Sequence, residues 1–208
     1  MASVFESKHP LIQEKIAALR SVETSPPNFR ALVRLLGTLL GLEATTNLPT
    51  RFRSVRTPLG DASGREVDGP IAIVPILRAG LGMADGLLDL IPEAMVWHIG
   101  LFRDEHTLEP TEYYSRVPKE SLARVALVAD PMLATGGSAV RACEILRESG
   151  VLDIRYLCLI AAPEGIHRLS SAMPEVPIFT GAIDQRLTEI GFIYPGLGDA
   201  GDRQFATA

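Results

Sequence analysis

The sequence predicts an α/β fold in which helices cover both faces of a parallel β-sheet. From residue 70 onward, short and almost wholly apolar segments alternate with segments whose apolar residues recur at helical spacing. An apolar run such as Ile71–Val74 is typical of a strand that is covered on both faces, as the strands of parallel sheets are. The alternation therefore predicts a doubly wound sheet, in which ligands bind beyond the carboxyl ends of the strands.

The elements of this core follow one another along the chain. Strands are expected at Ile71–Val74, Ala94–Leu101, Arg124–Ala129, Ile154–Ala161 and Val176–Thr180. Helices are expected at Leu81–Leu90, Gly137–Glu148 and Glu164–Ala172. Residues that carry chemistry should be sought directly after each apolar run.

Two helices and a strand are expected ahead of this core. Leu11–Arg20 has apolar residues at helical spacing. A second helix is expected to begin after Ser25, a plausible N-cap that two prolines follow, and to run to about Glu43. Arg51–Thr57 alternates charged and apolar residues, which predicts a strand with one solvent-exposed face.

Composition excludes several classes of protein. The 208 residues are 47% apolar and 22% charged, as in an ordinary globular domain. A net charge of −5 argues against a non-specific nucleic-acid binder, which would normally be basic. Only three of the twenty cationic residues are lysines. The arginine excess suits bidentate phosphate recognition, but a GC-rich genome produces the same bias, so the count alone decides nothing.

Signals for export and membrane insertion are not found in the sequence. Residues 1–10 lack the apolar core of a signal peptide, and no apolar run approaches the ~18 residues that span a bilayer. Cys143 and Cys158 are too far apart for a CxxC motif and are expected to be free, buried thiols. A cytoplasmic protein without a membrane partner is expected.

Unusual residues follow the ends of three predicted strands. The turn Pro75–Gly82 places Arg78 before two glycines, where backbone amides and a fixed positive charge could meet an anion. An ordinary strand–helix turn with a solvated arginine is the alternative. The polar segment Phe102–Pro118 carries charges of both signs and could be a lid or arm, or a solvated hairpin.

The segment Asp130–Ser138 is the most informative of these strand ends. Asp130 follows a buried-strand run and could accept hydrogen bonds from a sugar diol. Thr135, two glycines and Ser138 then offer amides and hydroxyls at a helix N-terminus, where an anion is favoured. Thr135 or Ser138 could serve only as a helix cap, but a cap does not require the preceding acid.

Asp130–Ser138 resembles the phosphoribosyl pyrophosphate (PRPP) loop of the type I phosphoribosyltransferases. Three further strings resemble the uracil branch of that family: Pro75–Met83 its pyrophosphate loop, Ala161–Ile166 another signature, and Pro195–Asp202 its uracil-binding tail. The resemblance extends from Lys8–Leu11 to the C-terminus, with the motifs in the same order. It implies that the chain transfers the 5-phosphoribosyl group from PRPP to N1 of uracil, giving UMP and pyrophosphate.

The resemblance also implies a type I phosphoribosyltransferase-like parallel sheet flanked by helices. Residues 1–208 would form a single domain with N-terminal helices at 10–46 and a core at about 68–181. A β-arm is implied at about 102–118, and a C-terminal uracil-binding hood at about 182–208.

Site residues follow from the same resemblance. The residues implied as catalytic are Arg78, Arg103, Asp130 and Asp199. Those implied to bind PRPP are Arg78, Arg103, Asp130, Pro131, Met132, Leu133, Ala134, Thr135, Gly136, Gly137, Ser138 and Asp199. Those implied to bind uracil are Ile193, Gly198, Asp199 and Ala200. Asp199 could act as a general base or could only orient its loop.

A cofactor and partners are implied as well. The wider type I pattern has two adjacent acids before the PRPP loop, whereas here Pro131 follows Asp130. Mg²⁺ is therefore expected to be held by pyrophosphate and water, with no side-chain ligands. The family resemblance implies a homodimer or larger homo-oligomer, and GTP, which activates some relatives, is a candidate effector.

Other motifs do not lead to a different function. Gly196–Gly201 spells GxGxxG, but no room remains for the helix and strand of a dinucleotide-binding unit. The sequence has no Walker A lysine, no GxSxG motif and no metal-ligand spacing among its four histidines.

Three rival functions are disfavoured by the sequence. The tail and the lone Asp130 argue against a phosphoribosyltransferase for adenine, hypoxanthine or orotate. The net charge of −5 argues against a non-catalytic PRPP or nucleotide sensor that binds RNA. A partner-binding scaffold explains none of the motifs.

Overall fold

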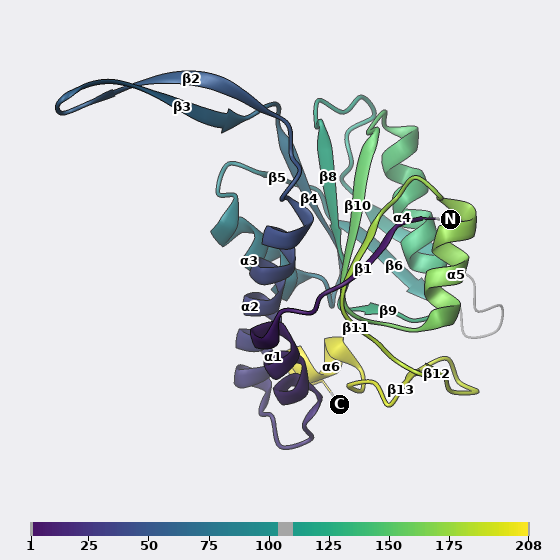
Figure 1. Cartoon of the computed structure of the whole chain (residues 1–208). Coiled ribbons are helices and arrows are strands. Elements are labelled where there is room, and N and C mark those ends of the chain that lie inside the picture. Colours follow the sequence, from purple (N-terminus) through teal and green to yellow (C-terminus); the bar gives the residue numbers. More distant parts are fainter. Residues whose placement is uncertain (1, 104–109, 208) are drawn as a thin grey trace.

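The computed structural model describes residues 2–103 and 110–207 and has a central β-sheet between two layers of helices (Figure 1). The order of the main strands is β1 (Val4–Glu6), β11 (Ile178–Ile183), β10 (Asp153–Ala161), β8 (Val125–Ala129), β4 (Ile71–Leu77), β6 (Ile99–Arg103) and β7 (Pro110–Ser115). Two short strands, β5 (Met95–Val96) and β9 (Met132–Leu133), pair with β4 and β10. Every pair in this sheet is parallel except β6 with β7, which confirms the predicted fold class.

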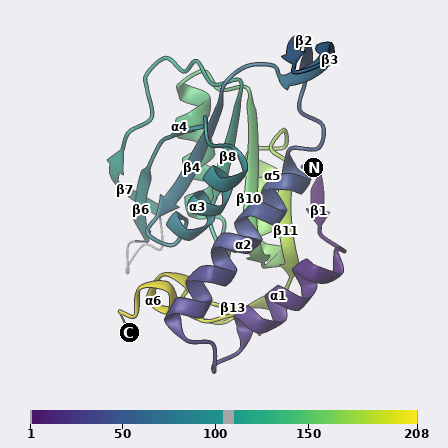
Figure 2. The ribbon, with the colours of Figure 1, turned by 90° about the vertical axis from the view of Figure 1, so that its left-hand side faces the viewer.

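Helices cover both faces of the sheet. One face is covered by α1 (Pro10–Arg20), α2 (Pro26–Ala44) and α3 (Leu81–Leu90), which lie toward the viewer in Figure 2. The other face is covered by α4 (Gly137–Glu148) and α5 (Pro163–Ala172). No helix in the described part of the chain is long and apolar enough to cross a bilayer.

The two helical layers explain the apolar runs. Along β8, Ala126 and Val128 belong to the core beneath α4 and α5, whereas Leu127 and Ala129 belong to the core beneath α1, α2 and α3. All four side chains are fully buried. A strand with cores on both sides needs an apolar residue at every position, and this produces an unbroken run rather than alternation.

The hairpin of β2 (Thr50–Thr57) and β3 (Gly60–Val67) corrects one sequence prediction. A strand with one exposed face was expected at Arg51–Thr57, but every residue of β2 is exposed, because the two strands pair only with each other. The hairpin projects away from the body of the protein (Figure 1). The alternating sequence pattern of β2 therefore does not correspond to a face that packs against the rest of this chain.

Other boundaries also differ from the predictions. The strand expected at Ala94–Leu101 is two short strands, β5 and β6, which pair with β4 in one register on either side of Trp97 and His98. β11 begins two residues later than expected, after Pro177, and continues to Ile183. Ser25 precedes α2 as expected, but its side chain forms no capping hydrogen bond. The strands β1, β3, β9, β12 (Arg186–Leu187) and β13 (Ile193–Tyr194) were not predicted, whereas β7 lies within the β-arm expected at about 102–118.

Candidate active site

The carboxyl edge of the sheet brings the predicted site segments together. β4 and β8 are parallel neighbours in which Pro75 lies opposite Ala129. Arg78 therefore follows the end of one strand where Asp130 follows the end of the next. The hood strands β12 and β13 and the helix α6 (Ala200–Phe205) lie beyond the same edge (Figure 1). This is the edge where the parallel sheet predicts a ligand site.

The segment from Asp130 to Ser138 surrounds a cavity of about 70 Å³. It leads into α4, whose N-cap is Gly136 in the left-handed conformation, with φ of 79°. Thr135, Gly137 and Ser138 thus lie at the N-terminus of a twelve-residue helix, where backbone amides and the helix dipole favour an anion. The remaining cavity residues are Met132, Leu133, Ala134, Ala139 and Tyr156.

Gly136 is required for close packing as well as for its backbone angle. A Cβ atom at this position would lie 2.9 Å from the carbonyl oxygen of Gly165 and 3.1 Å from Cβ of Arg168. Gly165 belongs to the Ala161–Ile166 string and lies in the first turn of α5. The first turn of α5 therefore packs directly against the Asp130–Ser138 loop, so these two segments of the sequence form one packed unit.

Asp130 has an unusual electrostatic environment. Its carboxylate is largely withdrawn from solvent, and this burial raises the pKa of Asp130 from an ordinary value of 3.8 to about 7. Tyr156 on β10 donates its hydroxyl to Oδ2 of Asp130 over 3.2 Å, and the amide of Met132 also favours the ionised form. A carboxyl group with a pKa near neutrality at a strand end is a feature of functional sites.

Arg78 lies across the same edge of the sheet. It follows a cis peptide bond at Leu77–Arg78 and has a half-exposed side chain. Its guanidinium lies 3.6 Å from a carboxylate oxygen of Asp202 and above the ring of Phe205, both in α6. Gly80 lets this turn approach β8, since a Cβ atom there would lie 2.3 Å from the carbonyl oxygen of Ala129. The side chain can reach a ligand from its present contacts with the hood.

The residues expected to bind uracil lie together in the hood. Ile193 is buried in β13, and Ala200 is buried at the start of α6. Gly198 has a φ of 80° and is exposed. Asp199 is the N-cap of α6 and accepts a hydrogen bond from the amide of Asp202 over 2.9 Å. This bond ties the side chain of Asp199 to the first turn of α6.

Arg103 is the last residue of β6, and its side chain lies outside the described residues. The expected arm at 102–118 also includes residues 104–109, which lie outside them. The rest of that segment includes β7, which extends the main sheet by pairing with β6.

Residues 6–207 match the uracil phosphoribosyltransferase family. The chain belongs to the uracil phosphoribosyltransferase family. It is 54% identical to the uracil phosphoribosyltransferase of Dictyoglomus thermophilum over 96% of this chain and 97% of that protein. It is 53% identical to that of Roseiflexus castenholzii over the full length of both.

Solved structures agree with this membership. A protein from Aquifex aeolicus has a TM-score of 0.92 with 40% identity, covering 99% of each chain. A hypoxanthine phosphoribosyltransferase from Staphylococcus aureus has a TM-score of 0.50 with 13% identity, over 87% of this chain and 84% of that one. The second likeness shows the type I phosphoribosyltransferase fold alone.

Several residues that shape the uracil phosphoribosyltransferase site were not predicted from the sequence. Gln204 is fully buried and donates its amide to the carbonyl oxygen of Ala79 over 2.9 Å, which joins the hood to the Arg78 turn. Glu164 accepts a hydrogen bond from the amide of Leu187 over 3.0 Å, which joins α5 to the hood. This bond lowers the pKa of Glu164. Each contact depends on residues far apart in the sequence, so no local pattern reveals it.

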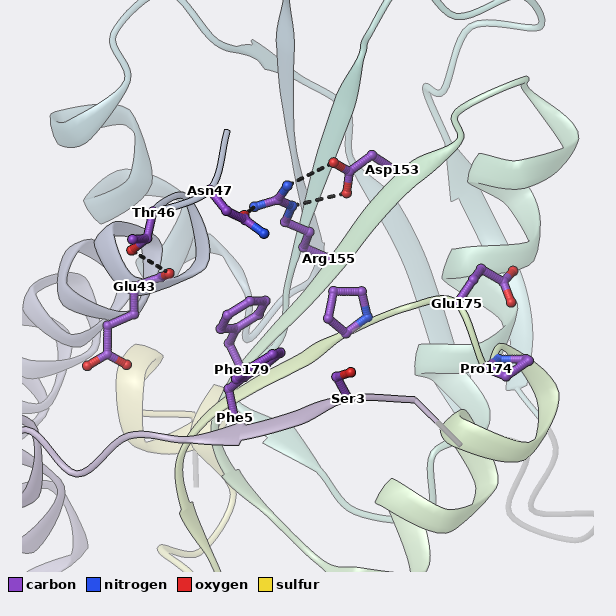
Figure 3. A pocket seen from close by; sticks show the side chains of 11 residues that line it. Ser3, Phe5, Glu43, Thr46, Asn47, Asp153, Arg155, Pro174, Glu175 and Phe179 are labelled. Atoms are coloured by element: carbon purple, nitrogen blue, oxygen red, sulfur yellow. Dashed lines mark hydrogen bonds and ion pairs between the residues drawn. The ribbon is translucent and has the colours of Figure 1, made fainter. Parts of the chain in front are cut away.

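A larger hollow of about 560 Å³ lies at the opposite end of the strands, between β1, α2 and the start of β10 (Figure 3). Its arginine, Arg155, is buried and donates to Asp153, to the amide oxygen of Asn47 and to the carbonyl oxygen of Ala44. Glu43 and Glu175 add negative charge to the lining. Because its cation is already engaged and its acids would repel phosphates, this hollow is a poor PRPP site despite its size.

Proposed function

We propose that the chain is a cytoplasmic uracil phosphoribosyltransferase that transfers the 5-phosphoribosyl group from PRPP to N1 of uracil, yielding UMP and pyrophosphate. The observation that carries this proposal is the Asp130–Ser138 loop, in which a strand-end carboxylate leads directly into a helix N-terminus. Membership of the uracil phosphoribosyltransferase family and relatives of that name support it. The domain is proposed to span residues 1–208.

The PRPP loop is proposed to bind both the 5-phosphate and the ribose diol of PRPP. Thr135, Gly136, Gly137 and Ser138 would bind the 5-phosphate, because a helix N-terminus offers it amides and a favourable dipole. Asp130 would accept hydrogen bonds from the ribose diol. The intervening residues Pro131, Met132, Leu133 and Ala134 would contact PRPP along the cavity wall. Binding the unreactive phosphate end lets remote binding energy orient C1 for the reaction.

The pyrophosphate is proposed to lie at the Arg78 turn. Guanidinium groups pair well with phosphate oxygens, and Arg78 is half-exposed beside the same strand end as Asp130. Arg103 is proposed to act with it. The two arginines would stabilise the charge that grows on pyrophosphate as its bond to C1 breaks.

Mg²⁺ is proposed as the cofactor. The described residues contain no group of three or more acidic, histidine or cysteine side chains that could share a metal ion. The ion would enter with pyrophosphate and keep water ligands, because Pro131 follows Asp130 and the loop offers one carboxylate. When bound, the ion would add positive charge beside the leaving group.

Uracil recognition is proposed to depend mainly on backbone groups. Ile193 and Ala200 would form apolar walls, and the exposed loop at Gly198 and Asp199 would offer amides and carbonyls to the uracil edge. A site that pairs both carbonyls and N3–H would reject cytosine, since a mispaired buried polar group costs roughly 1–3 kcal/mol. The capping bond of Asp199 supports a role in orienting this loop rather than in removing a proton.

A product assay with PRPP and Mg²⁺ would test the function directly. Uracil, cytosine, adenine, hypoxanthine and orotate would be offered in parallel, with and without GTP. UMP from uracil alone is the expected result, and any increase with GTP would identify it as an effector. Product from another base would favour the rival transferases. PRPP binding without any product would favour the non-catalytic sensor.

A homo-oligomer is the proposed assembly. The β2–β3 hairpin supports it, because two strands that pair only with each other are marginally stable in water. Phe52 and Leu59 are exposed on this hairpin by 75% and 101%. A second copy of the chain would cover these side chains.

A further inference from the structure

The hydroxyl of Tyr156 lies where it can influence the orientation and the ionisation of the Asp130 carboxyl group. Tyr156 lies in the middle of β10, is fully buried and is opposite Val128 of β8. Its hydroxyl reaches past the end of β8 and donates to Oδ2 of Asp130 over 3.2 Å. Tyr156 also lines the cavity inside the PRPP loop. The remaining cavity-lining residues all lie between Asp130 and Ala139, so among the described residues Tyr156 is the one lining residue from outside this segment.

A buried tyrosine needs a hydrogen-bond partner, and a backbone carbonyl would satisfy it. Here the partner is instead the carboxylate that the proposed function assigns to the ribose diol. A hydrogen bond to a charged acceptor is stronger than one to a neutral acceptor. The bond satisfies the phenol and favours one orientation of the carboxylate.

Asp130 requires such a fixed orientation because it has no acidic neighbour in sequence. Pro131 occupies the position where the wider type I pattern has a second acid. A single carboxylate must then meet both hydroxyls of the diol. Free rotation of that carboxylate would weaken the contact, since each immobilised group costs conformational entropy on binding.

We propose that Tyr156 is a positioning residue for PRPP, holding the Asp130 carboxylate in the orientation and ionisation state that bind the ribose diol. This inference rests on the proposed function. Burial favours the neutral acid at Asp130, and the Tyr156 hydroxyl opposes that effect by stabilising the anion. Loss of the hydroxyl should therefore raise the pKa of Asp130.

The other titratable groups near Tyr156 and Asp130 would not produce this rise in the pKa of Asp130. Cys158 on β10 and Cys143 on α4 are the thiols that interact with Tyr156, and burial raises the pKa of each to about 12. Burial also raises the pKa of Tyr156 itself well above its ordinary value. All three groups are neutral near pH 7, where Asp130 titrates.

Tyr156→Phe tests the inference because it removes the hydroxyl and keeps the ring. The KM for PRPP should rise about five- to tenfold with little change in kcat or in the KM for uracil, because the diol contact exists before and during the reaction. The acidic limb of kcat/KM for PRPP should move to higher pH. Thr180→Val is the matched control, since it removes a buried hydroxyl from the neighbouring strand that bonds to the carbonyl of Ala182. Thr180→Val should leave the KM for PRPP and the pH of the acidic limb unchanged.

A double-mutant cycle distinguishes action through Asp130 from a general loss of packing. PRPP binding would be measured by calorimetry in Asp130→Asn with and without Tyr156→Phe. The second substitution should have little effect in the protein that already carries Asp130→Asn if Tyr156 acts through the carboxylate. Equal losses in both backgrounds would overturn the inference.

If Tyr156→Phe does not fold, 3-fluorotyrosine introduced at this single position offers an isosteric alternative. Its more acidic phenol is a stronger donor, so the acidic limb should move to lower pH. An unmoved limb would contradict the positioning role. Wild-type protein that makes no UMP would instead overturn the proposed function, which keeps the two failures distinguishable.

Discussion

Arg20 and Asp184 form a bidentate ion pair between residues 164 positions apart in the sequence, with hydrogen bonds of 2.8 and 2.5 Å. The same carboxylate accepts a hydrogen bond from the amide of Gly196 over 2.9 Å, and Arg20 donates to the carbonyl oxygen of Gly196 over 2.7 Å. The C-terminus of α1 thus fixes the loop that leads into Gly198 and Asp199. Both charged side chains are mostly buried, so few water molecules could replace these bonds.

Arg20→Ala should weaken uracil binding more than PRPP binding, because it releases the hood loop and leaves the PRPP loop in place. It should also destabilise the protein by about 3 kcal/mol, since Asp184 would remain buried without its partner. Steady-state kinetics with each substrate varied, together with thermal unfolding, would measure both effects. Arg34→Ala is the matched control, because Arg34 forms a similar bidentate pair with Asp89 on the exposed surface of α2 and α3. That variant should lose little stability, because an exposed ion pair is screened by solvent, and should keep its kinetics. An equal change in both KM values for Arg20→Ala would contradict the hood assignment.

Asp130→Asn should abolish most activity and yet stabilise the free protein at alkaline pH. The folded pKa of Asp130 is raised from 3.8 to about 7, so the folded state binds more protons than the unfolded state between these values. The stability contributed by the protonated acid is present below about pH 4 and is lost as the pH rises through about 7. Asparagine imitates the neutral acid at every pH.

The melting temperature of Asp130→Asn should accordingly exceed that of the wild type at pH 8, and the difference should shrink as the pH falls toward 4. Calorimetric scans across this range would test the linkage. A constant difference at every pH would show that Asp130 does not titrate as its burial predicts. Unchanged kcat/KM for PRPP would remove Asp130 from the mechanism.

The strands were predictable where packing alone decides them. β8 and β10 have cores on both sides, so burial produces apolar runs that a sequence reveals directly. β1 has three residues, which is too short for any period to be recognised. The β2–β3 hairpin led to the opposite error. The alternating residues of β2 predict a strand with one packed face, but every residue of β2 is exposed.

The site was predictable to a similar extent. The carboxyl ends of parallel strands share one edge, so the alternation of strands and helices predicts that Asp130 and Arg78 lie at that edge, and the structure shows that their strands are neighbours. Asp184 could not, because it follows β11 as an ordinary turn acid and its importance depends on Arg20 and Gly196. Tyr156 was also missed, since a tyrosine within an apolar run is typical of core. Only the three-dimensional contact with Asp130 distinguishes it.

Arg78→Lys should lower kcat by about tenfold to a hundredfold, because lysine keeps the positive charge and loses the planar fork that pairs with phosphate oxygens. The fold should be unaffected, since the Arg78 side chain is half-exposed and its ion pair and ring contact are both with α6 at the surface. Stopped-time assays of UMP formation at saturating substrate would measure kcat. Arg124→Lys is the control, because Arg124 precedes β8 at the opposite edge of the sheet and pairs with Asp68. Equal losses in the two variants would argue against a pyrophosphate role for Arg78.

Gly136→Ala should raise the KM for PRPP and destabilise the protein by about 1–3 kcal/mol. The substitution combines a positive φ with a contact of 2.9 Å between the new Cβ atom and the carbonyl oxygen of Gly165. Gly150→Ala separates these two effects, because Gly150 also has a positive φ, of 92°, but no atom lies within 4 Å of a Cβ atom there. That control should lose some stability and keep its KM for PRPP. Equal KM values in all three proteins would mean that the loop accommodates the extra methyl group.

Phe52→Ser and Leu59→Ser should shift the protein toward a smaller species in sedimentation velocity experiments. Both side chains are exposed on a hairpin whose strands pair only with each other, and a second copy of the chain would bury them. Leu152→Ser is the matched control, since Leu152 is 89% exposed just before β10 and lies outside the hairpin. It should leave the sedimentation coefficient unchanged. A wild-type protein that sediments as a monomer would refute the homo-oligomer outright. An oligomer that both hairpin variants retain would instead move the interface to another surface of the chain.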